Sequence, residues 1–549
     1  MTLKMKINLI NYTKRSLAIL FLIIAETTSF AQVTPFNVAI VPMEIEELGG
    51  LQAYAWGQAD GKWLIVGGRL DGLHRRQPWA AFDEAGHNTN ILVIDPVSKE
   101  KWAAPLTSLP TSIQEQLSAT NLEFQQDGDF LYVVGGYGYS ATELDHTTYP
   151  NLCAINVPNT IEAIINGTPF DSNFRQIEDP LMQVTGGYLN KIYDTFYLIG
   201  GQKFIGRYNP MGPDFGPGFI QEYTNAIRKF KIIDDGITLA IEHLEEIIDT
   251  VSLHRRDYNA VEQIMPSGEE GVTAFSGVFQ YDVDLPFLNS VNIDSAGYIV
   301  NDEFTQYYNH YHCARLPIYS ESNNAMHTIF FGGIAQYYDL EGVLVQDNNV
   351  PFINTIARVT RNADGTMAEY KLPIEMPNLL GSGSEFIPIT SVPHFENEVF
   401  DLDEFTEDST LVGYIYGGIS STEANIFFTN TGVESTASSQ IFEVYIITDT
   451  TLEVDELNPQ SIGSLKMTVY PNPNYGKFTA LYYLNQATDV KIILHNAEGK
   501  ELENRVFENV PAGQNKYQKK IRGLAKSGIY FLTIETAYES ATQKIIIDN

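Results

Sequence analysis

Two copies of one basic motif carry the side chains best suited to bind a ligand in this sequence. Leu73-His74-Arg75-Arg76 is repeated as Leu253-His254-Arg255-Arg256, and Arg69 lies shortly before the first copy. Arginine grips a carboxylate or a sulfate through a planar fork of donors. The motif therefore predicts an anion-binding pocket, provided that the fold brings its two copies together.

A third basic segment, Tyr311-His312-Cys313-Ala314-Arg315, directly follows His310. On a strand, His310 and His312 would point the same way and could bind a metal together with His74 or His254. A structural role is favoured, because no carboxylate ligand is apparent beside them. We therefore predict no metal site, and the sequence implies no particular cofactor. The predicted ligand-binding residues are Arg69, His74, Arg75, Arg76, His254, Arg255, Arg256, His310, His312 and Arg315.

The 549-residue chain is strongly acidic, with 34 Lys and Arg against 68 Asp and Glu. This excess of carboxylates argues against nucleic acid or an anionic membrane as the main partner. A cationic pocket in such a body would attract an acidic sugar or a peptide carboxylate. The alternative is that the arginines pair with these acids and hold the structure together, since a buried arginine normally has a partner.

Apolar strands that end in paired glycines recur along the chain and indicate which elements position these residues. The run from Phe130 to Gly138, FLYVVGGYG, is one of them. Glycine permits positive φ and close approach of backbones, so each pair predicts a tight turn packed against a neighbour. The pairs are Gly67-Gly68, Gly135-Gly136, Gly200-Gly201, Gly332-Gly333 and Gly417-Gly418, with Ser276-Gly277 as a degenerate copy.

Each repeat predicts four β-strands and almost no helix: an extended run, a turn, the apolar strand, a loop and two further strands. Because the apolar strands have no polar side, both faces of each sheet must be covered. Six such units fit between about residue 36 and residue 457, with seven units as the main alternative. The two cysteines, Cys153 and Cys313, fall in different units, so we predict two separate thiols.

The glycine pairs, the apolar runs before them and the segment from Ile91 to Trp102 resemble the kelch repeat. The resemblance covers about 420 residues and implies an all-β, six-bladed propeller, whose sheets cover one another around a central channel. In such a propeller both basic motifs lie on the same face, around the channel mouth. Residues 37–48 are expected to form a strand that completes the last sheet with residues 441–457, joining the two ends of the ring.

Residues 1–31 are typical of a secretory signal peptide. Basic residues precede the apolar run from Ser16 to Ala25, which is too short to span a bilayer, and Ser29-Phe30-Ala31 offers a cleavage site. An uncleaved anchor is the alternative. We expect no transmembrane segment in the mature chain, in which residues 32–458 form the propeller.

Residues 461–549 differ in charge from the rest, with 11 Lys and Arg against 8 Asp and Glu. Four of their motifs resemble the C-terminal sorting domain of the type IX secretion system of Bacteroidetes. This resemblance implies a small Ig-like β-sandwich that the outer-membrane export machinery recognises, and a protein secreted or held on the outer surface of a Gram-negative bacterium. An ordinary adhesive sandwich is the alternative. The motifs are Tyr470-Pro471-Asn472-Pro473, Gly476-Lys477-Phe478, Asn496-Ala497-Glu498-Gly499-Lys500 and Ser527-Gly528-Ile529-Tyr530.

Two functions fit these features. The first is a secreted or cell-surface propeller that recognises a glycan or protein partner at the channel mouth, an anionic one if the arginines form the pocket. The second is a carbohydrate-active enzyme, because kelch-like propellers include sialic-acid epimerases and copper-radical galactose oxidases. An epimerase would need a base among the arginines, and Tyr258 and Glu262 are the nearest candidates. We expect binding rather than catalysis.

Overall fold

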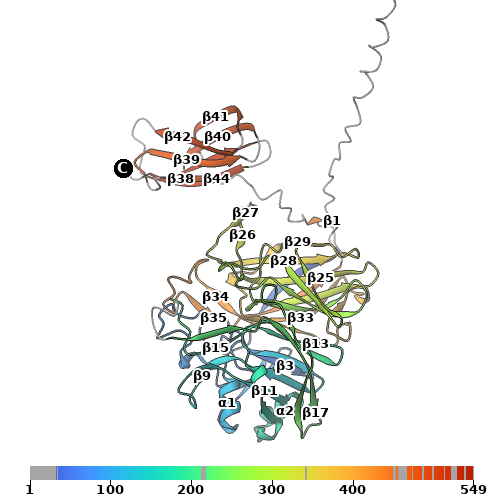
Figure 1. Cartoon of the computed structure of the whole chain (residues 1–549). Helices are drawn as coiled ribbons and strands as arrows, with labels where there is room; N and C mark the ends of the chain where they lie inside the picture. The colour runs from blue at the N-terminus through green and yellow to red at the C-terminus, as the bar shows by residue number, and fades with distance from the viewer. Residues whose placement is uncertain are drawn as a thin grey trace, which may run out of the picture.

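The computed structural model is almost entirely β-structure (Figure 1), with two short helices, α1 (Thr111–Leu117) and α2 (Val157–Asn166), and a few 3-10 turns. None of the described helices has the length and apolar character needed to cross a membrane. The expected signal peptide, residues 1–31, lies outside the described residues. The structure describes residues 32–33, 35–211, 218–340, 343–448, 453–454, 467–470, 472, 474–484, 487–496, 500–511, 513–520, 528–536 and 540–547.

Six antiparallel four-stranded arrays, numbered here as sheets 1 to 6, form the framework of the chain between residues 37 and 447. Neighbouring strands of sheets 1 to 5 follow one another along the chain, whereas β2 joins sheet 6 from the far end of the sequence. Two short strands, β19 (Ile247–Ile248) and β32 (Phe400–Asp401), extend sheets 3 and 5. The strands are, sheet by sheet, β3 (Ala55–Ala59), β4 (Lys62–Val66), β5 (Asn90–Asp95) and β6 (Glu100–Pro105); β7 (Glu123–Asp127), β8 (Phe130–Val134), β11 (Asn151–Asn156) and β12 (Phe174–Glu178); β13 (Tyr188–Ile192), β14 (Thr195–Ile199), β17 (Ala226–Asp234) and β18 (Leu239–His243); β20 (Asn259–Ile264), β21 (Glu270–Phe275), β22 (Ser290–Asp294) and β23 (Gly297–Asn301); β24 (Arg315–Ser320), β25 (Ala325–Ile334), β28 (Phe352–Arg361) and β29 (Met367–Glu375); β31 (Ser384–Pro388), β33 (Ser409–Gly417), β36 (Ile441–Ile447) and β2 (Asn37–Met43).

Each sheet shares an apolar core with the next, and sheet 6 shares one with sheet 1. The second strands are buried on both faces, as their lack of a polar side predicts; in β8, for example, the last four residues are all buried. The Trp63 and Tyr414 rings, from sheets 1 and 6, have centroids 5.3 Å apart. The shared cores contain, in order, Val66 and Leu131, Val134 and Leu198, Ile199 and Val272, Phe275 and Phe330, Ile329 and Ile415, and Tyr414 and Trp63.

The expected pairing of the two ends is present, because β2 lies antiparallel to β36 with Asn37 opposite Ile447 and Met43 opposite Ile441. Sheet 6 is thus completed by residues from the start of the chain. A second link comes from Gly418, whose N–H donates to the carbonyl of Leu51 at 2.9 Å, just ahead of sheet 1.

The glycine pairs adopt the conformation that the sequence predicts. Both residues of every pair have positive φ, and so do Ser276 (54°) and Gly277 (108°) in the degenerate copy. The pairs also contact the next sheet closely: a Cβ on Gly135 would lie 1.9 Å from the carbonyl oxygen of Val184, to which Gly136 donates its N–H at 2.9 Å. These positions accept glycine because the neighbouring backbone occupies the space of a side chain.

Each repeat is longer than its four strands require, and some of the additional residues form small extra sheets beside the glycine pairs. Most of them follow the second strand of a sheet, on the side where the glycine pair turns. They are β9 (Tyr137–Ser140), β10 (Asp145–Thr148), β15 (Gln202–Ile205) and β16 (Ile220–Tyr223), then β26 (Tyr337–Leu340) and β27 (Val343–Gln346), then β30 (Leu379–Leu380), β34 (Ile419–Ser421) and β35 (Ser435–Ala437).

The C-terminal strands form two sheets with one core of their own, in which Phe478, Ile492 and Ile545 are buried. Part of each sorting-domain motif lies outside the described residues, except for the one at Gly476 to Phe478. The strands are β38 (Met467–Tyr470), β39 (Lys477–Leu484) and β42 (Gly513–Lys520) in one sheet, and β40 (Thr488–Asn496), β41 (Glu501–Val510), β43 (Gly528–Glu535) and β44 (Ser540–Ile547) in the other.

Candidate functional site

A pocket of about 710 Å³ lies where the chain enters the first strands of the six sheets. Connections that follow the glycine pairs supply the rest of its wall. Segments that lead into all six sheets contribute to it, which makes the pocket a product of the whole assembly and not of any one repeat. The residues that lead into the first strands and line the pocket are Gln52, Ala53, Thr120, Asn121, Thr185, Arg256, Asp257, Tyr311, His312, Ser382 and Gly383.

Aromatic rings and side-chain amides dominate the pocket wall. Phe204 and Phe219 stack with ring centroids 4.8 Å apart, and Tyr223 stacks on His254 at 3.7 Å. Tyr281, which also lines the pocket, is 64% exposed. The amide groups come from Gln52, Asn121, Gln202, Asn209, Gln221, Gln280, Asn348 and Asn349.

Six of the ten predicted ligand-binding residues line this pocket, and two of its three arginines are paired with a neighbouring aspartate. Arg69 donates two hydrogen bonds of 2.6 Å to Asp71. Arg256 pairs with Asp257 and donates to the Tyr223 hydroxyl at 3.0 Å. The six residues are Arg69, His74, Arg76, His254, Arg256 and His312.

Packing holds the His74 ring between Phe82 and Tyr208, while His254 and His312 each have one polar partner. Burial lowers the pKa of His74 to about 4, so its ring is uncharged at neutral pH. Burial and the Arg256 charge lower the pKa of His254, whose Nδ1 lies 2.7 Å from Asn225. His312 lies 3.4 Å from the carboxylate of Glu385.

The other four predicted residues lie elsewhere. Arg75 is exposed outside the pocket lining. Arg255 is 1% exposed and donates to the carbonyls of Ser252, Ser276 and Asn289. Because its donors are used by backbone oxygens, Arg255 holds loops together and does not face the pocket.

The expectation that His310 and His312 share one side of a strand is wrong. Both lie in the turn ahead of β24 with left-handed backbone, φ 51° and 37°. His310 is fully buried, stacks on Phe330 and has Nδ1 2.8 Å from the carbonyl of Gly332, whereas His312 lines the pocket. In the described part of the chain, no group of three or more His, Cys, Asp and Glu is placed to hold a metal ion. Cys153 and Cys313 are both buried free thiols, as predicted.

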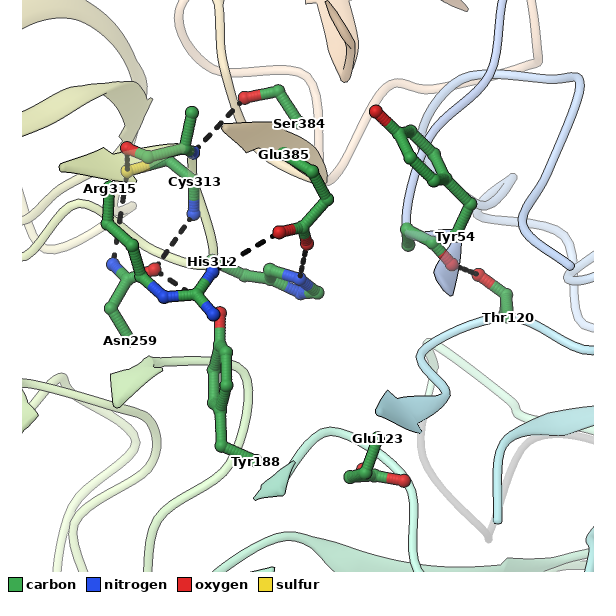
Figure 2. Close-up of polar contacts among 12 residues, drawn as sticks. Tyr54, Thr120, Glu123, Tyr188, Asn259, His312, Cys313, Arg315, Ser384 and Glu385 are labelled. Atoms are coloured by element: carbon green, nitrogen blue, oxygen red, sulfur yellow. Dashed lines mark hydrogen bonds and ion pairs between the residues drawn. The ribbon is translucent and has the colours of Figure 1, made fainter. Parts of the chain in front are cut away.

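Arg315 belongs to a polar cluster with Glu385, His312 and Tyr188, which come from different sheets and the turns that lead into them (Figure 2). Its guanidinium donates to Glu385 at 3.2 Å and lies 4.6 Å from the Tyr188 ring centroid. Arg315 and Glu385 also line a smaller pocket of about 300 Å³. Glu385 also contacts His312, which lines the larger pocket. Its carboxylate therefore lies between residues of the two pockets.

The acidic partners of Arg256 and Arg315 differ in how readily they can be predicted from the sequence. Asp257 directly follows Arg256, so that pair could have been predicted from adjacency. Glu385 is 70 residues from Arg315, and no local pattern marks it.

The suggested catalytic bases do not lie at the larger pocket. Tyr258 is fully buried and donates to the carbonyl of Ile199 at 2.6 Å. Glu262 lines the smaller pocket and accepts a 2.9 Å hydrogen bond from Asn190.

Breaking the central ion pair should destabilise the fold. Arg315→Met leaves Glu385, 2% exposed, without its arginine, and we expect a loss of about 3–5 kcal/mol in the free energy of unfolding. The double variant R315M/E385L should be more stable than R315M, because it removes the buried charge as well. Urea unfolding of the mature chain measures both.

The matched control for this pair is Lys231→Met, which breaks an exposed pair with Asp194 and should leave the unfolding midpoint unchanged. A double variant less stable than R315M would contradict the assignment of Glu385 as a buried charge that depends on Arg315.

Comparison with known proteins identifies the C-terminal part of the chain. Residues 468–548 match the family model of the secretion system C-terminal sorting domain. This tail directs export by the type IX system, and the protein is secreted or held at the cell surface. No curated protein matches the sequence.

Solved structures resemble the chain only distantly. The structure of YjhT covers 72% of this chain and 97% of its own, with 11% identity and a TM-score of 0.37. Dihydro-heme d1 dehydrogenase NirN in complex with DHE covers 88% of this chain and 76% of its own, with 10% identity and a TM-score of 0.28.

Proposed function

We propose that residues 32–458 form a closed, six-bladed kelch-like propeller that binds a glycan in the larger pocket, at the mouth of its channel. The series of shared cores that returns from sheet 6 to sheet 1 supports six blades in a ring. The proposed ligand-binding set is the six predicted residues that line the pocket, Arg69, His74, Arg76, His254, Arg256 and His312. The type IX system delivers this binding unit to the cell surface or the medium.

The observation that carries the proposal is the composition of the pocket wall. Sugar rings present apolar C–H faces and a perimeter of hydroxyl groups. Aromatic side chains cover such faces, while amides both donate to and accept from hydroxyls. A concave site with rings, amides and a few charges is suited to a small polar ligand.

Binding is favoured over catalysis because the pocket offers few free acid–base groups. Asp257 is paired with Arg256, burial lowers the pKa of His74 to about 4 and so makes it a weak base, and both suggested bases lie outside the pocket. Asp284 is the exposed exception. A carbohydrate-active enzyme is therefore the second candidate, and it requires Asp284 or a histidine to act as the base.

The test is a glycan array of neutral and acidic oligosaccharides probed with the mature secreted chain, followed by calorimetry on the sugars that bind. We expect at least one class to bind. Tyr281→Ala should weaken it about tenfold, since a half-buried aromatic contact contributes roughly 1.5 kcal/mol. Tyr193→Ala is the control, because Tyr193 is exposed and does not line the pocket.

Absence of binding by a folded protein to any glycan on the array would overturn the proposal. Conversion of a bound sugar into a product would establish the enzyme in its place.

A further inference from the structure

The three arginines of the larger pocket are not equivalent. Arg69 and Arg256 are each neutralised by an aspartate, Asp71 and Asp257. The guanidinium of Arg76 makes no ion pair and no hydrogen bond with any of the described residues, and it lies over the Phe428 ring, 5.1 Å from the ring centroid. Arg76 is therefore the pocket arginine with a charge available to a ligand.

The backbone that carries Arg76 is fixed by a loop of sheet 6. Asn430 is fully buried and donates to the carbonyls of Leu73 and His74 at 2.7 and 2.9 Å. Its own carbonyl accepts the N–H of Arg76 at 3.0 Å. Because the backbone is held before any ligand arrives, only the side chain of Arg76 remains to be ordered on binding.

The position of Arg76 contrasts with that of Arg75, the next residue along the chain. Arg75 has no acidic partner among the described residues either, but it is exposed and does not line the pocket. Arg75 and Arg76 thus give two charges without an acidic partner among the described residues, one at the pocket and one in solvent. The one unpaired carboxylate of the described pocket lining, Asp284, is exposed.

We propose that the larger pocket receives an acidic oligosaccharide and that Arg76 pairs with its carboxylate or sulfate group. This inference rests on the proposed glycan-binding function and names the ligand class. Arg76 acts as the specificity-determining residue, while the aromatic rings and amides contact the parts that acidic and neutral sugars share.

The experiment measures binding of three probes to the mature chain by calorimetry: an oligogalacturonate, its neutral carboxyl-reduced counterpart and a sulfated galactan oligosaccharide. The wild-type chain should prefer one of the acidic probes over the neutral one, and the preferred probe distinguishes carboxylate from sulfate. Arg76→Met should weaken that acidic probe about ten- to a hundredfold, as expected for loss of a charge-assisted contact, and should leave binding of the neutral probe unchanged.

Arg75→Met removes the same charge one residue away and should change the affinity less than threefold, which is about 0.6 kcal/mol. Arg76→Lys keeps the charge without the fork and should fall between wild type and Arg76→Met. Equal losses in the Arg75 and Arg76 variants would overturn the inference, because they would indicate a general charge effect.

The two proposals fail in different ways. A wild-type chain that binds the neutral probe as well as both acidic probes would overturn the role of Arg76 and leave glycan binding in place. A chain that binds none of the three probes and no sugar on the array would overturn glycan binding itself. Thermal unfolding of each variant confirms that the fold is intact.

Discussion

A chain that ends at residue 460 is expected to stay inside the cell envelope of the native bacterium. The sorting domain matched at residues 468–548 is the part that the export machinery recognises, and its strands share a core with one another. Removing it should leave the other described sheets folded. Immunoblots of periplasm, cell surface and medium should find the truncated chain in the periplasm alone.

The control for the truncation is to attach the C-terminal segment to an unrelated protein. Residues 461–549, fused to a periplasmic reporter that carries residues 1–31 at its start, should bring the reporter to the surface or the medium. Appearance of the truncated chain outside the cell at the wild-type level would show that export depends on another segment.

Gly135→Ala is expected to cost about 4 kcal/mol or more of unfolding free energy, in the range reserved for severe steric defects. The new Cβ would lie 1.9 Å from the carbonyl oxygen of Val184, which is backbone and cannot rotate away. Relief requires sheets 2 and 3 to separate locally, and the hydrogen bond from Gly136 to Val184 is then lost as well. Urea unfolding and resistance to protease report the change.

Gly128→Ala is the matched control for this variant. Gly128 also has positive φ, 58°, but a Cβ there meets nothing within 4 Å. The variant should lose only about 1–2 kcal/mol of unfolding free energy, the cost of placing alanine in the left-handed region. Equal losses at the two positions would show that conformation alone, and not packing against the next sheet, explains the glycine pairs.

The sequence predicted the elements whose cause is local. The pattern of an apolar strand that ends in two glycines predicts both the burial of the strand and the turn that follows it. Even the degenerate copy at Ser276 keeps positive φ. The pairing of β2 with β36 was also predictable, because a strand remains over at each end of the repeats.

The site was predicted less completely, because its geometry depends on contacts between distant residues. The two basic motifs do bring His74, Arg76, His254 and Arg256 to one pocket. The neighbours of each arginine decide whether its guanidinium is available to a ligand. That of Arg255 is not, because it donates hydrogen bonds to backbone carbonyl groups. The motif itself is the same in both copies, so spacing alone could not separate these roles.

The pairing of β2 with β36 also constrains how the molecule is made. β2 is synthesised well before its partner, which follows roughly four hundred residues later in the chain. Closure over such a separation is slow, and until then β36 has an unpaired edge that invites aggregation. Sheet 6 can therefore be finished only after β36 has been synthesised, and a protein that shields free strand edges would raise the yield of the native form.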